Sequence, residues 1–195
     1  MKIGVLALQG AFIEHIHMLS GMGVSAVAVR LPGELDGLDG LIIPGGESTT
    51  MGKLAVAYDL VDALREFGKL KPLWGTCAGA ILLAREIHRP QPLLALMDIV
   101  IARNAFGRQV DSFIAQLAVP ALAVITKENP PFPAVFIRAP IIESVSGDTA
   151  VLANLPDGRI VAARQKNHLA TSFHPELTGD ARFHKYFLLM IEGKV

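Results

Sequence analysis

The sequence predicts an α/β fold of three layers, with helices on both faces of a mostly parallel sheet and short antiparallel strands added at one side. In the N-terminal half, two kinds of segment follow one another. One is a continuous apolar run in which apolar and polar residues do not alternate, and the other has apolar residues that recur every three or four positions. This is the pattern of strands buried on both faces and of the helices that cover them. In the C-terminal half, short apolar runs are separated by Pro and Gly, which is typical of short strands and turns.

Length and composition narrow the class of protein. The 195 residues suffice for one compact domain over 1–195, and no linker-like segment divides them. Hydrophobic residues make up 51% and the formal net charge is zero, so no basic surface is predicted for nucleic acid or anionic lipid. The N-terminus lacks the apolar core of a signal peptide, and no apolar run reaches the ~18 residues of a membrane span. We therefore expect a cytoplasmic protein without a membrane or nucleic-acid partner.

The N-terminal half predicts strands that alternate with helices. The strands expected here are 3–8, 24–29, 40–44 and 72–74, and the helices are 11–22, 57–67 and 78–86. His15 and His17 lie two apart on the first helix, which does not match the four-residue spacing of a helical metal site. We therefore expect no metal.

The C-terminal half predicts short strands beside the parallel sheet, some of them antiparallel. The candidates are 98–102, 113–119, 134–138, 141–145, 150–154 and 159–164. Asp157-Gly158, between the last two, is a two-residue signal for a hairpin turn.

The strongest chemical signal is Gly75-Thr76-Cys77-Ala78-Gly79, which holds the only cysteine and lies between a strand and a helix. Gly-x-Cys-x-Gly is the spacing of a nucleophile elbow, in which the glycines permit the strained turn. At the start of a helix a thiolate is favoured, and the N–H of Ala78 can donate to an oxyanion. The alternative is a cysteine that only packs in the core.

A second glycine-rich turn, Gly45-Gly46-Glu47-Ser48, follows the strand at 40–44. It does not fit a phosphate-binding loop, because five residues rather than four separate its second glycine from the next one. Its backbone N–H groups can supply the second oxyanion donor that an elbow nucleophile needs. The alternative is an ordinary turn in which Ser48 or Thr49 caps a helix.

His174-Pro175-Glu176 supplies a base and a group to orient it. Pro175 restricts the residue before it to extended geometry, in which residues two apart point to the same side, so Glu176 can contact the imidazole. The other ring nitrogen is then left to face Cys77, as in a catalytic triad. The alternative is a histidine at a strand end with no catalytic role.

Two arginines, Arg103 and Arg138, each end an apolar run, where a side chain can reach a cleft. Arginine binds a carboxylate through two parallel hydrogen bonds, so both are candidates for holding a substrate carboxylate. Surface salt bridges are the alternative, since most arginines are exposed.

Taken together, these motifs resemble the class I, or triad-type, glutamine amidotransferases. More narrowly, the sequence is similar to the family of glutaminase subunits of pyridoxal 5'-phosphate synthases, and the similarity covers essentially the whole chain. The blocks that carry it are Leu6-Ala7-Leu8-Gln9-Gly10-Ala11, Pro44-Gly45-Gly46-Glu47-Ser48-Thr49-Thr50, Arg103-Asn104-Ala105-Phe106-Gly107-Arg108-Gln109, Phe136-Ile137-Arg138-Ala139-Pro140 and Thr171-Ser172-Phe173-His174-Pro175-Glu176-Leu177-Thr178. The resemblance implies a class I glutamine amidotransferase-like, flavodoxin-like fold.

For the activity, the resemblance implies a glutaminase that uses no cofactor. Cys77 attacks the side-chain amide of L-glutamine, His174 acts as acid and base, and Glu176 orients it. Ammonia leaves, and water then hydrolyses the thioester to glutamate. The oxyanion donors are the backbone N–H groups of Gly46 and Ala78. The residues implied to bind glutamine are Gly46, Glu47, Ser48, Arg103, Ile137 and Arg138.

The resemblance also implies a partner, a separate synthase subunit that receives the ammonia within a hetero-oligomeric complex. We expect the isolated chain to be poorly active, with the synthase selecting the orientation of the Gly45–Gly46 peptide, which lacks a Cβ on either side. Binding through the first helix, which contains Glu14 and His15, is one route for the synthase to act on this loop. Two other interpretations remain, a cysteine hydrolase or thiol-dependent stress protein of similar architecture and a binding module with an inert cysteine. Glu176 beside His174 counts against both.

Two segments depart from the family pattern, 88–92 and 94–96, where the family tends to carry a glycine near Ala95. We expect both to lie away from the catalytic residues and to affect only loop shape and a contact with the synthase.

Overall fold

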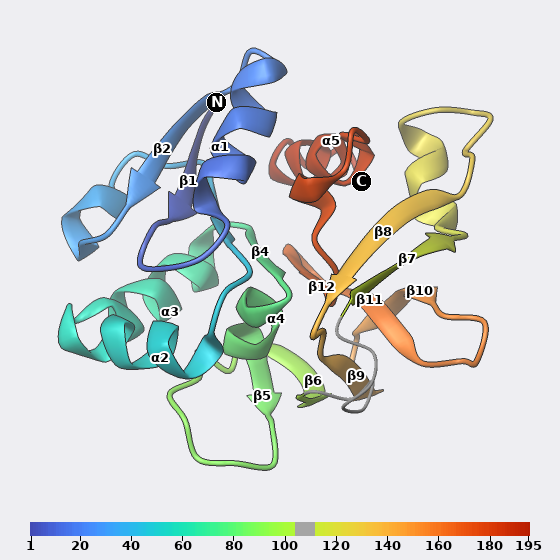
Figure 1. Cartoon of the computed structure of the whole chain (residues 1–195). Helices are drawn as coiled ribbons and strands as arrows, with labels where there is room; N and C mark the ends of the chain where they lie inside the picture. The colour runs from blue at the N-terminus through green and yellow to red at the C-terminus, as the bar shows by residue number, and fades with distance from the viewer. Residues whose placement is uncertain (104–111) are drawn as a thin grey trace.

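The computed structural model describes residues 1–103 and 112–195, and in these ranges three layers form around a ten-stranded sheet (Figure 1). The strands are β1 Lys2–Leu6, β2 Ser25–Val29, β3 Gly40–Ile43, β4 Leu73–Thr76, β5 Ala84–Glu86, β6 Met97–Ala102, β7 Ser112–Leu117, β8 Phe132–Ile137, β9 Ile141–Val145, β10 Ala150–Asn154, β11 Ile160–Gln165 and β12 His168–Thr171. The α-helices are α1 Phe12–Gly21, α2 Ser48–Ala57, α3 Leu60–Leu70, α4 Ala78–Leu83 and α5 Arg182–Ile191. Short 3-10 helices are η1 Pro32–Leu35, η2 Pro120–Val124 and η3 Pro175–Leu177.

The sheet has a parallel half and a mostly antiparallel half. Its order is β2-β1-β3-β4-β12-β11-β9-β6-β5, with β10 paired to β11. The first five strands are parallel, with Ile42 opposite Trp74 and Trp74 opposite Leu169. Their order is that of flavodoxin-like sheets, which confirms the predicted fold class. Beyond β12, strands β11, β9 and β6 pair antiparallel, as the Pro- and Gly-punctuated half predicted.

Two hydrophobic cores lie on the two faces of the sheet. Successive residues of a strand point to opposite faces, so Leu41 and Ile43 enter one core and Ile42 enters the other. The first core contains residues of α2, α3 and α4, and the second contains residues of α1, α5, β7 and β8. Helices therefore cover both faces, as the absence of alternation in these strands predicted (Figure 1).

Most predicted elements are confirmed, with boundaries shifted by up to three residues. The strands predicted at 141–145 and 150–154 are β9 and β10. The hairpin at Asp157-Gly158 is also confirmed, because β10 and β11 pair antiparallel on either side of it.

Other elements differ from the sequence-based expectation. Ala84–Glu86, predicted as the end of a helix, is strand β5, because this segment pairs with β6. The strands β7 and β8 form a separate two-stranded sheet instead of extending the main one. β2 is an edge strand with partly exposed residues, so it is not buried on both faces. Helices α2 and α5 and the strand β12 were not predicted as elements.

The turn from β4 into α4 places Cys77 in a strained conformation, with φ 48 and ψ −104. Its N–H donates to the carbonyl of Thr171 at 2.8 Å, which ties the elbow to β12. The neighbouring glycines serve a different purpose from the one predicted. A Cβ on Gly79 would lie 1.9 Å from the carbonyl oxygen of Ile43, and one on Gly75 would lie 2.4 Å from the backbone of Gly79. The strain is therefore on the cysteine, and the glycines permit close packing.

We predict that Gly79→Ala destabilises the protein, because its Cβ would collide with the backbone of β3, which cannot move aside alone. Overpacking of this kind costs on the order of 2 kcal/mol or more. For a chain of this size, that lowers the melting temperature by roughly 4 to 8 °C in thermal unfolding. Gly33→Ala is the control, because nothing lies within 4 Å of a Cβ at that position. Equal melting temperatures for the two variants would contradict this account of the elbow.

Candidate active site

A pocket of about 380 Å³ opens at the carboxyl ends of the parallel strands. Gln9 follows β1, Gly46 follows β3, Cys77 follows β4 and His174 follows β12. These ends meet at one edge of the sheet, and open α/β sheets bind ligands there, where the strand order reverses. The reversal here lies between β1 and β3. The volume is within the range of small-molecule sites.

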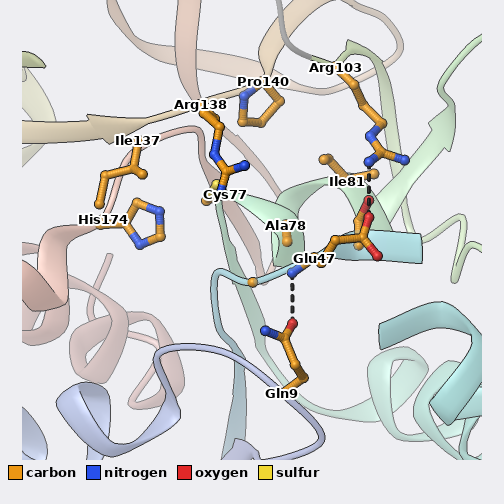
Figure 2. Close-up of a pocket in the computed structure, with 12 residues that line it drawn as sticks. Gln9, Glu47, Cys77, Ala78, Ile81, Arg103, Ile137, Arg138, Pro140 and His174 are labelled. Carbon is orange, nitrogen blue, oxygen red and sulfur yellow. Dashed lines mark hydrogen bonds and ion pairs between the residues drawn. The ribbon is translucent and has the colours of Figure 1, made fainter. Parts of the chain in front are cut away.

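The structure brings every predicted site residue except Glu176 to the wall of this pocket (Figure 2). The lining residues are Gln9, Gly46, Glu47, Ser48, Cys77, Ala78, Ile81, Arg103, Ile137, Arg138, Pro140 and His174. Gln9, Ile81 and Pro140 were not predicted. Gln9 was named only within a block that carries the family resemblance, although its place directly after the first strand puts it at the same edge as the others.

Glu176 lies behind His174, with its side chain fully buried. Its Oε1 is 2.7 Å from His174 Nδ1, so the predicted pair is present. The local geometry differs from the expectation, because Pro175–Leu177 forms a 3-10 turn instead of an extended segment. His174 itself is non-helical, with φ −107 and ψ 85, and its N–H donates to the carbonyl of Val135 at 2.8 Å. A tight turn anchored to β8 therefore brings the carboxylate back to the ring.

His174 is held in its charged form. Burial disfavours the imidazolium, but hydrogen bonds to Cys77 and Glu176 and the charges of both groups outweigh it and raise the pKa of His174 to about 10. The charged imidazole therefore lies beside Cys77, where it can serve as a proton donor.

Glu47 caps helix α2 and is strongly acidic. Its carboxylate accepts hydrogen bonds from the N–H groups of Thr49 at 3.1 Å and Thr50 at 2.7 Å. Partial burial alone would raise its pKa, but hydrogen bonds from the hydroxyl and N–H of Thr50 and from Thr49 lower the pKa of Glu47 to about 2. The cap is therefore Glu47 and not Ser48 or Thr49, which the alternative interpretation of this turn had as the cap.

Arg103 reaches the pocket but is already paired. Its Nη2 is 3.1 Å from Glu47 Oε1, and its Nη1 donates to Thr49 Oγ1 at 3.0 Å and to Gln91 Oε1 at 3.1 Å. Gln91 also accepts from Ser48 Oγ at 3.4 Å. The departing segment 88–92, which we expected to lie away from the catalytic residues, thus contacts two residues predicted to bind glutamine, Ser48 and Arg103. Ala95 has φ 55, a conformation that glycine adopts more easily. The rest of the motif after Arg103, at 104–109, lies outside the described residues.

Arg138 contrasts with Arg103. It lies in the turn between β8 and β9 with φ 42, and its side chain is exposed. Its guanidinium points toward Cys77 (Figure 2), and no residue of 1–103 or 112–195 forms an ion pair with it. A free guanidinium at the mouth of the pocket can bind a carboxylate with two hydrogen bonds.

The turn after β1 holds the loop that contains Gly45 and Gly46. The N–H of Ala11 donates to the carbonyl of Gly45 at 3.0 Å, and the N–H of Glu47 donates to Gln9 Oε1 at 2.7 Å (Figure 2). A trans peptide directs its C=O and N–H to opposite sides, so the N–H of Gly46 points away from Ala11. This structure thus holds one orientation of the Gly45–Gly46 peptide, and a rotation of that peptide has to break the bond to Ala11.

His15 does not have the role expected from its helix. Its side chain is fully buried, so His15 itself is not available to a partner, whereas Glu14 is exposed, and contact through the first helix stays a prediction. Its Nε2 is 3.3 Å from Glu176 Oε2. Within the described ranges, no three His, Cys, Asp or Glu residues gather in a way that could hold a metal ion. The helices of the same ranges include none with the length and apolar character of a membrane span.

Comparison with known proteins identifies the class and then the family. A crystal structure described as a glutamine amidotransferase matches this fold with a TM-score of 0.91 and 46% identity, covering 98% of this chain and 100% of that one. The fold is therefore that of a class I glutamine amidotransferase. Residues 5–193 match the SNO glutamine amidotransferase family, and the chain belongs to this family. PurLQS from Thermotoga maritima, at 16% identity and a TM-score of 0.74, shares the fold alone.

Relatives with a stated role match over nearly their whole length. A protein from Herpetosiphon aurantiacus, named pyridoxal 5'-phosphate synthase subunit PdxT, is 59% identical over 96% of this chain and 99% of its own. Proteins of the same name from Dehalococcoides mccartyi and Moorella thermoacetica are 56% and 54% identical, over 97% and 98% of this chain and 97% and 100% of their own.

We predict that the protein loses stability between pH 7 and pH 4, because three buried histidines are neutral in the folded chain. Burial, and to a smaller extent neighbouring positive charge, lowers the pKa of His168 to about 4 and lowers the pKa of His15 well below its usual value. Burial lowers the pKa of His184 to about 3. In the unfolded chain all three titrate near 6.5. Below that pH the unfolded state binds more protons than the folded state, so the free energy of unfolding falls as the pH is lowered toward the folded pKa values.

The measurement is the melting temperature at pH 7.5, 6 and 5. In His168→Phe the decline should be smaller than in the wild type, because one titrating group is removed. His17→Gln, at an exposed position, is the control and should keep the full decline. An unchanged decline in His168→Phe would show that this histidine does not contribute.

Proposed function

We propose that this protein is the glutaminase subunit of a pyridoxal 5'-phosphate synthase. It hydrolyses the side-chain amide of L-glutamine through a thioester on Cys77 and supplies ammonia to a separate synthase subunit. The observation that carries the proposal is the meeting of Cys77, in its strained elbow, with the His174–Glu176 pair at one pocket. The names of relatives up to 59% identical support the choice of synthase.

The first half of the proposed reaction forms the thioester. The Cys77 thiolate attacks the amide carbon of glutamine, and the carbonyl oxygen becomes an oxyanion. The backbone N–H groups of Ala78 and Gly46 can stabilise that charge. His174, charged through its contacts with Cys77 and Glu176, gives its proton to the departing nitrogen, and ammonia leaves.

The second half removes the product. His174 is then neutral and takes a proton from water, which attacks the thioester carbon. The second tetrahedral intermediate collapses, the carbon–sulfur bond breaks, and glutamate leaves. The imidazole then again carries the proton that it took from water. Glu176 at 2.7 Å keeps the Nδ1 proton of the ring in place throughout, so that Nε2 is the nitrogen that exchanges protons.

The charges around the pocket suit an amino acid, which carries both an ammonium and a carboxylate. We assign the substrate carboxylate mainly to Arg138, because Arg103 already shares its charge with Glu47 at 3.1 Å. The backbone at Gly46, Glu47 and Ser48 and the side chain of Ile137 complete the wall. Arg103 and Glu47 together form a polar end to the pocket that is fixed before glutamine binds.

We predict that Arg138→Ala raises KM for glutamine by about 10- to 100-fold, the cost of losing a charge-assisted hydrogen bond, and changes kcat much less. The carboxylate is held equally in the ground and transition states, so its loss affects binding more than bond cleavage. Arg103→Ala should raise KM less, since Glu47 already neutralises part of its charge. Arg85→Ala, which removes a surface pair with Asp98, is the control. Steady-state ammonia release with the synthase present gives both constants. An unchanged KM in Arg138→Ala would remove this assignment.

The partner is the second part of the proposal. The synthase subunit, acting near the Gly45–Gly46 loop, selects the peptide orientation in which the Gly46 N–H serves the oxyanion, and so couples hydrolysis to a waiting acceptor. Losing one oxyanion donor lowers the rate by about a hundredfold or more, enough to silence the free subunit. A cytoplasmic location fits this chemistry, because the reducing cytosol keeps the nucleophilic thiol free.

The test is ammonia release from saturating glutamine by the wild type and by Cys77→Ala, each alone and with the synthase subunit. We expect the wild type to be at least about a hundredfold faster with the synthase. Cys77→Ala should show no turnover in either case, while melting like the wild type. A diazoketone analogue of glutamine should label Cys77 only. Turnover in Cys77→Ala would exclude the cysteine mechanism, and equal wild-type rates with and without synthase would exclude the coupling.

A further inference from the structure

Behind the candidate triad lies a chain of buried polar contacts that the mechanism above does not use. His15 of α1 lies with its Nε2 3.3 Å from Glu176 Oε2 and 3.2 Å from Thr76 Oγ1. Its Nδ1 is 2.9 Å from Nε2 of His184, on α5. Both histidines are fully buried, on the face of the sheet that α1 and α5 cover (Figure 1). The contacts therefore run from Cys77 through His174, Glu176 and His15 to His184.

The second carboxylate oxygen of Glu176 determines which nitrogen of His15 carries the proton. Glu176 Oε2 is buried and accepts no well-aligned hydrogen bond from the described residues, and its ion-pair contact there is with His15 Nε2. If the proton were on Nδ1, a lone pair on Nε2 would face the carboxylate oxygen, and that oxygen would be left without a donor at a cost. With the proton on Nε2, the N–H lies between Thr76 Oγ1 at 3.2 Å and Glu176 Oε2 at 3.3 Å and so stabilises the carboxylate, while Nδ1 accepts from the Nε2–H of His184 at 2.9 Å.

Both imidazoles are neutral, which suits this arrangement. Burial, followed by the charges of His184 and His174, lowers the pKa of His15 well below its usual value, and burial lowers the pKa of His184 to about 3. A cation at His15 would compete with His174 for the negative charge of Glu176. A neutral N–H of His15 instead holds one oxygen of the Glu176 carboxylate. The negative charge of the carboxylate then stays available to the His174 imidazolium at the other oxygen.

We propose that His15 is a positioning residue for the glutaminase reaction, which holds Glu176 through an Nε2–H donor whose tautomer is set by His184. This inference rests on the proposed function. The charged or titratable groups around His174 are Cys77 from the elbow, Glu176 from η3, Arg138 from the β8–β9 turn, and His15 of α1 beyond Glu176. Of these, His15 acts on His174 only through the carboxylate.

The activity test compares His15→Phe, which keeps a flat ring without a donor, with His15→Gln, whose amide nitrogen can take the place of Nε2. With the synthase present, His15→Phe should lower kcat by roughly tenfold or more, as loss of an outer-shell orienter does in other sites, with KM for glutamine unchanged. In this variant Glu176 is held less firmly and therefore raises the pKa of His174 by a smaller amount than in the wild type. The alkaline limb of the kcat/KM profile should then move to lower pH. His15→Gln should recover most of both effects. His168→Phe, a buried histidine at the opposite end of β12, should leave kcat and the profile unchanged.

The tautomer gives a readout that needs no activity. Nitrogen-15 NMR of the histidine rings in the wild type should show a neutral His15 protonated at Nε2, and likewise His184. A proton on Nδ1 of His15 overturns the proposal, as does a folded His15→Phe with the wild-type kcat and pH profile, or a His15→Gln as impaired as His15→Phe. If His15→Phe does not fold, His15→Gln and the NMR result decide. A wild type that releases no ammonia with the synthase would instead defeat the proposed function and leave the tautomer result standing.

Discussion

The close approach of α4 to β3 is the constraint on which the rest of the site depends. Gly79 packs against the carbonyl of Ile43 at a distance that admits no Cβ, and Gly75 packs in the same way against the start of the helix. Because the helix begins so close to the sheet, the chain has to turn within one residue, and Cys77 takes the strained conformation that results. The thiol is thereby fixed at the carboxyl edge of the sheet, next to the strand that leads to His174.

Behind that thiol, the site is held by polar groups that water does not reach. Glu176 has no exposed side-chain surface, and it lies between His174 and His15. A buried carboxylate is costly unless donors surround it, and here the donors come from a turn and from a helix on the same face of the sheet. In this packing, contacts with Cys77 and Glu176 outweigh burial and raise the pKa of His174, whereas burial lowers the pKa of His15.

The substrate side of the pocket is organised differently, by groups at the surface. Glu47 is tied to the first turn of α2 and pairs with Arg103, and Gln91 joins them from a loop. Arg138 stands apart, exposed and without an ionic partner in the described part of the chain. The Gly45–Gly46 loop is held by hydrogen bonds to Gln9 and Ala11, in the turn after β1. The groups proposed to bind the substrate thus lie in turns and at the start of a helix, whereas Cys77 and His174, the proposed nucleophile and base, are held by buried contacts.

Local patterns in the sequence determined the α/β class, most of the strands, the cysteine elbow and the pairing of His174 with Glu176, because each is encoded within a few neighbouring residues. Strand β12 escaped notice because it is four residues long and begins and ends with polar residues, and only its place between β4 and β11 makes it a strand. The contact of His15 with His184 joins positions 169 apart, and that of Gln91 with Arg103 depends on a loop folding back. No spacing rule contains such contacts. They exist because α1 and α5 pack on the same face of the sheet and because the strand ends meet at one edge. Only the tertiary structure decided both.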